Sequence, residues 1–222
     1  YINTLGWFAY SLYDQIFDED VDTQFLPILV FILRKIYLYY GSQKDFEIFA
    51  QLDIACLSEA FPDRSKKYFD LSILYKKSFG CVLPFLSTLN NKKLAPGSAD
   101  VQNLSKFFRH YLIAKQLNDD AHDWEFDLQR GRLTYPIFLL TKLAHNKKRD
   151  QRGFFWKKVF PKILATMTHH LNRAEKLLQR IDVRIDTKPL SLLLEDQKKS
   201  VILAQAERNH VLDFLAAYSM IK

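Results

Sequence analysis

The scarcity of glycine and proline constrains the fold of this chain more than any other feature. Its 222 residues include only 6 Gly and 7 Pro, both below average usage. Because these residues mark turns and the ends of elements, a chain with few of them is expected to form few turns and long helices. Apolar and polar residues show no sustained alternation of the kind that predicts strands. We therefore predict an all-α fold, with residues 1–222 forming a single domain.

Gly, Pro and polar clusters indicate where these helices begin and end. We expect helices over about Thr4–Asp18, Phe25–Tyr40, Lys44–Ala60, Ser65–Phe79, Cys81–Leu89, Gln102–Asp127, Tyr135–His145, Phe154–Arg180 and Leu190–Ile221. The clearest loop is Asn90–Asp100, and the basic stretch Lys147–Arg152 is expected to be a second one.

Composition excludes several classes of protein. With 48% hydrophobic and 14% aromatic residues, the chain can bury a large core, which excludes a disordered tail. Its 2 Cys exclude a disulfide scaffold and indicate a reducing compartment. The longest apolar run, Phe25 to Leu33, is too short for a transmembrane helix, and no signal peptide is visible. We expect a cytoplasmic protein without a transmembrane segment, with peripheral membrane association as the alternative.

The charge of the chain is basic overall but unevenly distributed. Its net charge of +7, from 32 Lys and Arg against 25 Asp and Glu, is typical of proteins that bind nucleic acid, anionic lipid or phosphorylated substrates. The acidic residues gather around positions 14–22 and 118–127. Two acidic clusters in a basic protein suggest cations bound beside anions, whereas the plainer interpretation is two solvated helix faces.

The first acidic cluster contains Asp14 and Asp18, which are four residues apart and share a helix face. Like charges at this spacing repel and destabilise a helix by a few tenths of a kcal/mol. Asp18 also falls at the expected helix C-terminus, where the helix dipole disfavours an anion. A bound cation would reverse both effects, so this pair is a candidate cation site.

The second acidic cluster lies at the C-terminal end of the helix expected over Gln102–Asp127. Asp119, Asp123 and Asp127 recur at intervals of four residues and predict a ladder of carboxylates along one stripe, with Asp120 one step around the helix. Carboxylates suit Mg²⁺, which is typically held by one or two of them together with substrate phosphates. The neighbouring His122 has no second His or Cys at a zinc-ligand spacing and is expected to be an ordinary polar histidine.

A basic turn comes directly after the second cluster. Gly131 allows a tight turn, because glycine adopts positive φ without steric cost. The turn would bring Arg132 near the acidic cluster, where a guanidinium can bind a phosphate through two parallel hydrogen bonds.

The segment from Gln116 to Pro136 resembles the second aspartate-rich region of class I isoprenoid synthases. In trans-prenyl diphosphate synthases this region reads Gln-x-x-Asp-Asp-x-x-Asp and then Gly-Lys-x-Thr-x-Pro. The matching residues here are Gln116, Asp119, Asp120, Asp123, Gly131, Arg132, Thr134 and Pro136. The segment also resembles the squalene and phytoene synthase form, in which Asp123 and Asp127 are the matching acids and Arg130-Gly131-Arg132 follows.

Two further segments are similar to the same family. Asp14 and Asp18 occupy the outer positions of its first motif, Asp-Asp-x-x-Asp, with Gln15 at the middle one, and they match the squalene-type Asp-x-x-x-Asp in full. Lys77-Ser78 resembles the Lys-Thr pair that faces the diphosphate in prenyl synthases.

The chain departs from the family pattern at two places. The Gly-Lys-x-Arg-Pro motif that lies upstream in prenyl diphosphate synthases would precede Tyr1, so we expect upstream helices to be missing. The Arg-Arg-Gly after the first motif is replaced by Val21-Asp22-Thr23-Gln24-Phe25, which contains no Arg. The second motif of terpene cyclases, Asn-Asp-x-x-Ser-x-x-x-Glu, fits poorly beyond Asn118-Asp119.

The resemblance implies a helical barrel of the isoprenoid synthase type, in which two aspartate-bearing helices face each other across a central apolar cavity. It implies a Mg²⁺-dependent prenyltransferase whose substrates are an allylic prenyl diphosphate and isopentenyl diphosphate. Metal ligands would be Asp14, Asp18, Asp119, Asp120, Asp123 and Asp127. Of these, Asp14, Asp18, Asp119 and Asp123 would be catalytic, and Lys77, Ser78, Gln116 and Arg132 would bind the substrate.

Other functions stay open at this point. Within the family, head-to-head condensation of the squalene or phytoene type and terpene cyclisation are alternatives to chain elongation. A non-catalytic prenyl-synthase-like subunit, which binds a partner or an isoprenoid without turnover, is an alternative of another class. Whatever the function, a homodimer or association with a missing N-terminal segment is expected. A nucleic-acid-binding protein ranks last, because the Asp ladder would repel a phosphate backbone.

Overall fold

A computed structural model shows that the chain is built from helices. The structure describes residues 4–5, 8–9, 11–12, 15, 25–40, 69–78, 82, 98–144, 151–181 and 185–219. Within these ranges it contains no strand, and none of the helices there has both the length and the hydropathy needed to cross a bilayer. The all-α prediction is therefore confirmed for the described part of the chain.

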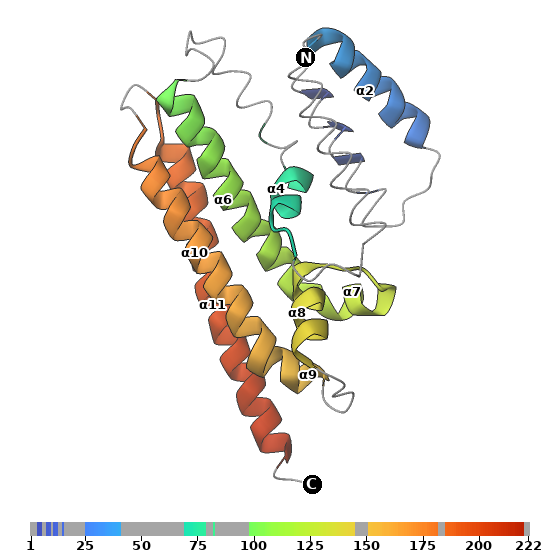
Figure 1. Ribbon diagram of the computed structural model, residues 1–222, viewed down its shortest axis with the longest axis vertical. Coiled ribbons are helices and arrows are strands. Elements are labelled where there is room, and N and C mark those ends of the chain that lie inside the picture. Colours follow the sequence, from blue (N-terminus) through green and yellow to red (C-terminus); the bar gives the residue numbers. More distant parts are fainter. Residues whose placement is uncertain are drawn as a thin grey trace.

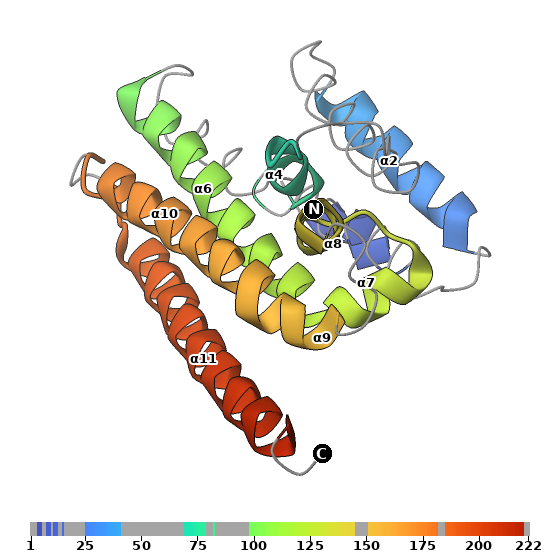
Figure 2. The same cartoon turned by 60° about the horizontal axis from the view of Figure 1, so that its bottom comes forward.

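Three long helices pack side by side and form the body of the protein: α6 (Ala99–His122), α10 (Phe160–Leu178) and α11 (Lys188–Ser219). α10 contacts both of the other two helices (Figures 1 and 2). α10 has one strongly apolar face, which contains Ile163, Met167 and Leu171 at intervals of four residues. All three side chains are buried, so burial of this face holds the helices together.

Shorter helices surround one end of this body. They are α4 (Ser72–Ser78), α7 (Trp124–Arg130), α8 (Tyr135–Ala144), α9 (Gln151–Phe154) and the π-helical turn η3 (Phe155–Val159). α4 packs against α6 and lies between α6 and α2 (Leu26–Tyr40) in both views (Figures 1 and 2).

Among the described residues, most of the buried hydrophobic side chains belong to two clusters. Cluster one surrounds Trp124, Phe155 and Phe160, and joins α4, α6, α7, α8, η3, α10 and α11. Cluster two surrounds Phe107 and Leu171, and joins α6, α10 and α11. Because α6, α10 and α11 contribute to both clusters, the two are connected through the long helices.

The helix expected over Gln102–Asp127 is interrupted in the structure. α6 ends at His122, Asp123 adopts φ −90° and ψ 4°, and α7 begins at Trp124. The Trp124 indole is buried and stacks on Phe155, with ring centroids 4.1 Å apart. We attribute the break to this stacking, because aromatic pairs contribute beyond their buried area.

The helix expected over Phe154–Arg180 exists but begins earlier and contains a π-helical turn. Its first turn, α9, starts at Gln151, which lies within the stretch Lys147–Arg152 that was predicted to be a loop. η3 then leads into α10. The carbonyl of Trp156, in η3, accepts a hydrogen bond from Arg208 Nε of α11 at 3.0 Å, so a side chain takes the place of a backbone partner.

Other expected helices can be compared only in part. α2, α8 and α11 confirm the helices expected over Phe25–Tyr40, Tyr135–His145 and Leu190–Ile221, with small differences at their ends. The described positions between residues 4 and 15 are helical. The helices expected over Lys44–Ala60 and Cys81–Leu89 lie outside the described residues, except for Val82.

Candidate functional site

A chain of hydrogen bonds links α4 to α6 at the centre of the candidate site. Ser78 Oγ donates to Gln116 Oε1 at 3.1 Å, and Gln116 Nε2 donates to Asp120 Oδ1 at 2.9 Å. Ser78 is 6% exposed and Asp120 is 5% exposed. A buried carboxylate is costly unless it accepts hydrogen bonds, so the Gln116 amide stabilises Asp120 in this position.

The local sequence explains why these side chains meet. Gln116 and Asp120 are one turn apart on α6 and therefore share a face. α4 is held against α6 by Leu74, which is fully buried. Ser78 is the last residue of α4, so its hydroxyl lies at the helix end that meets Gln116.

The start of α4 is fixed by Asp70. Its carboxylate accepts hydrogen bonds from the Ser72 N–H at 2.9 Å and from Ser72 Oγ at 2.8 Å. Burial by itself would raise the pKa of Asp70, but these two hydrogen bonds and the positive charges of Lys76 and Arg109 lower it below its usual value. Arg109 of α6 also lies over the ring of Tyr75, 5.9 Å from its centroid, which adds a second link between the two helices.

The outer side of α6 carries the other polar residues of this segment. Asp119 accepts from Lys115 Nζ at 2.9 Å, in an ion pair that is about half exposed. The exposed His122 pairs through Nδ1 with the Asn118 carbonyl at 2.7 Å and lies 3.4 Å from Glu207 of α11. The prediction that His122 is an ordinary polar histidine agrees with these contacts.

The basic turn after α7 is a compact helix cap. Gly131 has φ 68°, its N–H donates to the Leu128 carbonyl, and the Arg132 N–H donates to the Asp127 carbonyl at 2.9 Å. This is the hydrogen-bond pattern of a Schellman cap, which favours glycine at the left-handed position. The cap confirms the predicted tight turn and fixes the backbone of Arg132 next to the end of α7.

The predicted carboxylate ladder is wrong as a single stripe. Asp123 is exposed and the Asp119 side chain is 42% exposed, whereas Asp127 is 4% exposed. Asp120, expected one step around the helix, is instead the residue buried beside Gln116. The break at Asp123 is the physical reason, because it separates the helix that carries Asp119 from the helix that carries Asp127.

These positions limit how the segment can hold a metal. In the part of the chain that the structure describes, no group of three His, Cys, Asp or Glu side chains is arranged to bind an ion. Mg²⁺ does not need such a cage, because it keeps waters and binds one or two carboxylates together with phosphate oxygens. Asp119 and Asp123, one turn apart and both accessible, fit a site of this kind once Lys115 releases Asp119.

Several predicted site residues cannot be placed. Asp14 and Asp18 lie outside the described residues, and so does the side chain of Lys77, although its backbone belongs to α4.

Thr134, which follows the basic turn, is buried. It is 4% exposed, and its hydroxyl has no hydrogen-bond partner among the described residues.

A histidine pair between α6 and α10 was not anticipated from the sequence. His110 Nδ1 and His170 Nδ1 are 2.8 Å apart, and the His169 ring lies edge-on to that of His170. Burial, together with His110, His169 and Arg109, lowers the pKa of His170 to about 4. The adjacent histidines at positions 169 and 170 were visible in the sequence, but their partner is 60 residues away and no local pattern predicts that contact.

Neither a protein-family model, nor a curated protein sequence, nor a solved structure matches this chain. Its function is therefore argued from its own residues.

Proposed function

We propose that this protein is a Mg²⁺-dependent isoprenoid synthase that ionises an allylic prenyl diphosphate and transfers the prenyl group. The proposal includes the fold of that superfamily, a helical barrel around an apolar cavity. It rests on the motifs in the sequence and on one observation in the structure.

That observation is the hydrogen-bonded chain from Ser78 through Gln116 to Asp120. In the family pattern, Lys77-Ser78 and Gln116-x-x-Asp119-Asp120 belong to different motifs that act on the same diphosphate. In this chain the two motifs are 38 residues apart and meet through buried polar side chains. Their contact supports the assignment, because it brings the two segments that resemble diphosphate-binding motifs next to each other in the fold.

Each residue would have a definite role in this reaction. Asp14, Asp18, Asp119 and Asp123 would hold Mg²⁺, which supplies Lewis-acid stabilisation of the diphosphate leaving group when bound. The cationic side chains of Lys77 and Arg132 would bind diphosphate oxygens. Asp120 would act as a positioning residue through Gln116. Loss of diphosphate from the allylic substrate would leave a carbocation, which is stabilised by aromatic side chains in a site that excludes water.

Calorimetry with inorganic diphosphate tests the metal assignment. We expect diphosphate to bind weakly in the presence of a chelator and at least about tenfold more tightly with Mg²⁺. The reason is that Mg²⁺ would be held by the protein carboxylates and by the diphosphate oxygens together. Asp14→Ala and Asp123→Ala should each remove this coupling. Asp213→Ala, which removes an exposed carboxylate from α11, is the matched control and should retain it. Equal diphosphate affinity with Mg²⁺ and with chelator would contradict the assignment.

Head-to-head condensation of the squalene or phytoene type is a second candidate. It rests on the sequence register in which Asp123 and Asp127 are the matching acids, and the structure buries Asp127, which is 4% exposed. If this register holds, Asp127→Asn should lower turnover as much as Asp123→Asn. If the prenyl-synthase register holds, Asp127→Asn should be nearly silent in turnover. The melting temperature of each variant shows whether lost activity reflects lost folding.

A non-catalytic subunit is the candidate from another class. It is favoured by the ion pair between Asp119 and Lys115, which occupies a proposed metal ligand. Incubation of the protein with Mg²⁺ and allylic diphosphates, with and without isopentenyl diphosphate, distinguishes an active synthase from a non-catalytic subunit. A prenylated product supports catalysis, and its chain length and linkage identify the reaction. Diphosphate binding without any product would support the non-catalytic subunit.

A further inference from the structure

The segment from α9 to just past α10 carries most of the net positive charge of the protein. Residues 151–181 include seven Lys and Arg but only one acidic residue, Glu175, an excess of six positive charges. The whole chain has a net charge of +7. Because nearly all of the net positive charge lies in this one segment, we expect it to have a role beyond general solubility.

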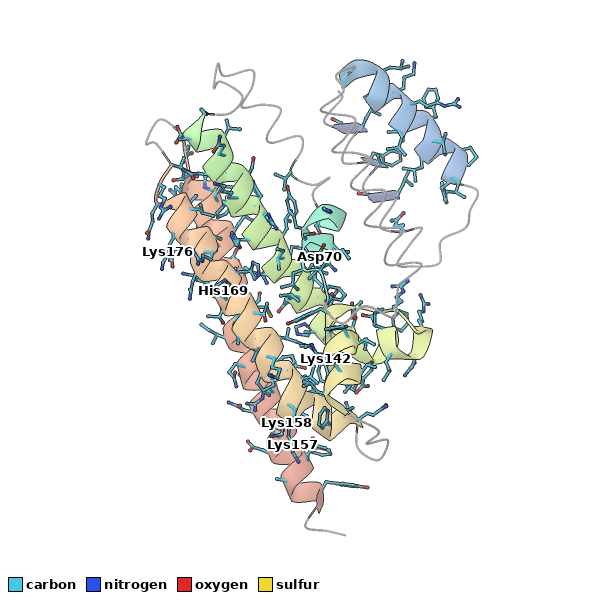
Figure 3. The ribbon with its side chains drawn as sticks, in the orientation of Figure 1. Asp70, Lys142, Lys157, Lys158, His169 and Lys176 are labelled. Carbon is cyan, nitrogen blue, oxygen red and sulfur yellow. The ribbon has the colours of Figure 1, made fainter. Side chains whose placement is uncertain are left out.

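Five of these seven cations form a single row, with His169 between them. The row consists of Lys158, Lys162, His169, Arg173, Lys176 and Arg180, at intervals of four, seven, four, three and four residues. Such intervals keep side chains on one helix face. All six side chains are exposed, and Figure 3 shows Lys158, His169 and Lys176 following one another along η3 and α10. At 1.5 Å per residue the row is roughly 30 Å long.

The row is not neutralised by neighbouring acids in the described part of the chain. Glu175 forms an ion pair with Lys198 of α11, at 2.6 Å. None of the Lys and Arg side chains of the row makes an ion pair with a described residue. The positive charge of the row is therefore available to an external anion.

The position of α10 determines the shape of the surface that the row presents. α10 packs against α6 and against α11, and it lies between them in Figure 2. Each helix is about 10–12 Å in diameter, so three side by side are much wider than the roughly 12 Å major groove of DNA. Because α6 and α11 flank α10, contact with a flat surface along the row fits this arrangement better than insertion of the whole three-helix face into a groove.

The chemistry of the row also disfavours single-stranded nucleic acid. Proteins that bind single strands combine cations with aromatic side chains on which bases stack. The six residues of the row include no Phe, Tyr or Trp. Of the aromatics near it on this segment, Phe155, Trp156 and Phe160 are buried in the core, and Phe154 is partly buried against it.

We propose that the face of α10 defined by this row docks the protein onto an anionic phospholipid bilayer. A bilayer is flat, its anionic headgroups are mobile, and each Lys or Arg brought to its surface adds about fivefold to the partition constant. The row contains no apolar side chain that could insert into the bilayer, so the association is electrostatic and reversible. The inference does not depend on the proposed activity.

Vesicle co-sedimentation with the full chain tests this proposal. We expect binding to phosphatidylcholine vesicles that contain about 30% phosphatidylglycerol, no binding to pure phosphatidylcholine, and loss of binding at about 0.5 M salt, where charges are screened within a few Å. Lys162→Gln, Arg173→Gln and Lys176→Gln combined should weaken binding about 100-fold, and Lys176→Gln alone about fivefold. Circular dichroism of each variant confirms that it is folded.

The matched control removes the same number of charges elsewhere. Arg34→Gln, Lys35→Gln and Lys142→Gln combined, at exposed positions on α2 and α8, should leave vesicle binding within a few-fold of the unchanged protein. Equal weakening by both triple variants would overturn the proposal, because net charge and not this face would then be responsible. Failure to bind anionic vesicles, or tighter binding to a DNA duplex than to vesicles at the same salt, would also overturn it.

Discussion

At the scale of single residues, Gly131 shows how one backbone conformation fixes the end of the second motif. It has φ 68° and closes α7 with the hydrogen bonds of a Schellman cap. A left-handed conformation costs a residue with a Cβ atom roughly 1–2 kcal/mol. We expect Gly131→Ala to lower the free energy of unfolding in urea by about this amount.

Gly131→Asn provides the comparison, because Asn tolerates the left-handed conformation better than Ala. It should be less destabilising than Gly131→Ala. If both substitutions cost the same, or neither has an effect, then the left-handed conformation at position 131 does not contribute to stability as expected.

At the scale of elements, the histidine pair makes the packing of α6 against α10 depend on pH. A hydrogen bond between two Nδ1 atoms needs one ring to be neutral, and Arg109 and Arg173 add positive charge around the pair. Burial is the largest cause that lowers the pKa of both His110 and His170, the latter to about 4. The unfolded chain therefore binds protons more readily than the folded one between about pH 6.5 and 4.

It follows that stability is highest above about pH 6.5 and falls as the pH decreases towards 4. Because the rings are only about half buried, solvent screening reduces the expected loss to roughly 1–2 kcal/mol. Urea unfolding at a series of pH values measures it. His170→Phe should flatten the dependence in this range, while His210→Gln, at an exposed position on α11, should preserve it. A slope unaffected by His170→Phe would assign the effect to other groups.

At the scale of the whole molecule, the two hydrophobic clusters should unfold together, since α6, α10 and α11 contribute to both. Leu171→Ala makes a cavity in cluster two, where the side chain is 2% exposed, and should cost about 2–5 kcal/mol. Trp124 and Trp156 belong to cluster one. We expect tryptophan fluorescence and circular dichroism to report the same lowered urea midpoint for this variant.

The exposed Leu203 of α11 supplies the control for this experiment, because it is 69% exposed. Leu203→Ala should change the free energy of unfolding by less than about 0.5 kcal/mol. Two separate transitions in the Leu171→Ala protein would mean that the clusters are independent units.

The sequence by itself determined the features that depend on local chemistry. Few Gly and Pro and the helical spacing of apolar residues predicted the helices α2, α8, α10 and α11, because helix formation is governed by residues three and four positions apart. Gly131 was correctly placed in a tight turn for the same reason, since positive φ selects glycine locally. The resemblance of the segment around Gln116 and Asp120 to a diphosphate-binding motif stays a prediction.

Only the tertiary structure decided which carboxylates are buried and which helices carry the polar contacts. The stacking of Trp124 on Phe155 accompanies the break at Asp123, and an aromatic partner 31 positions away cannot be inferred from helical periodicity. The contact of Ser78 with Gln116 likewise depends on how α4 packs on α6. These outcomes are settled by packing between distant segments, because the free energy of burial overrides local preference wherever the two conflict.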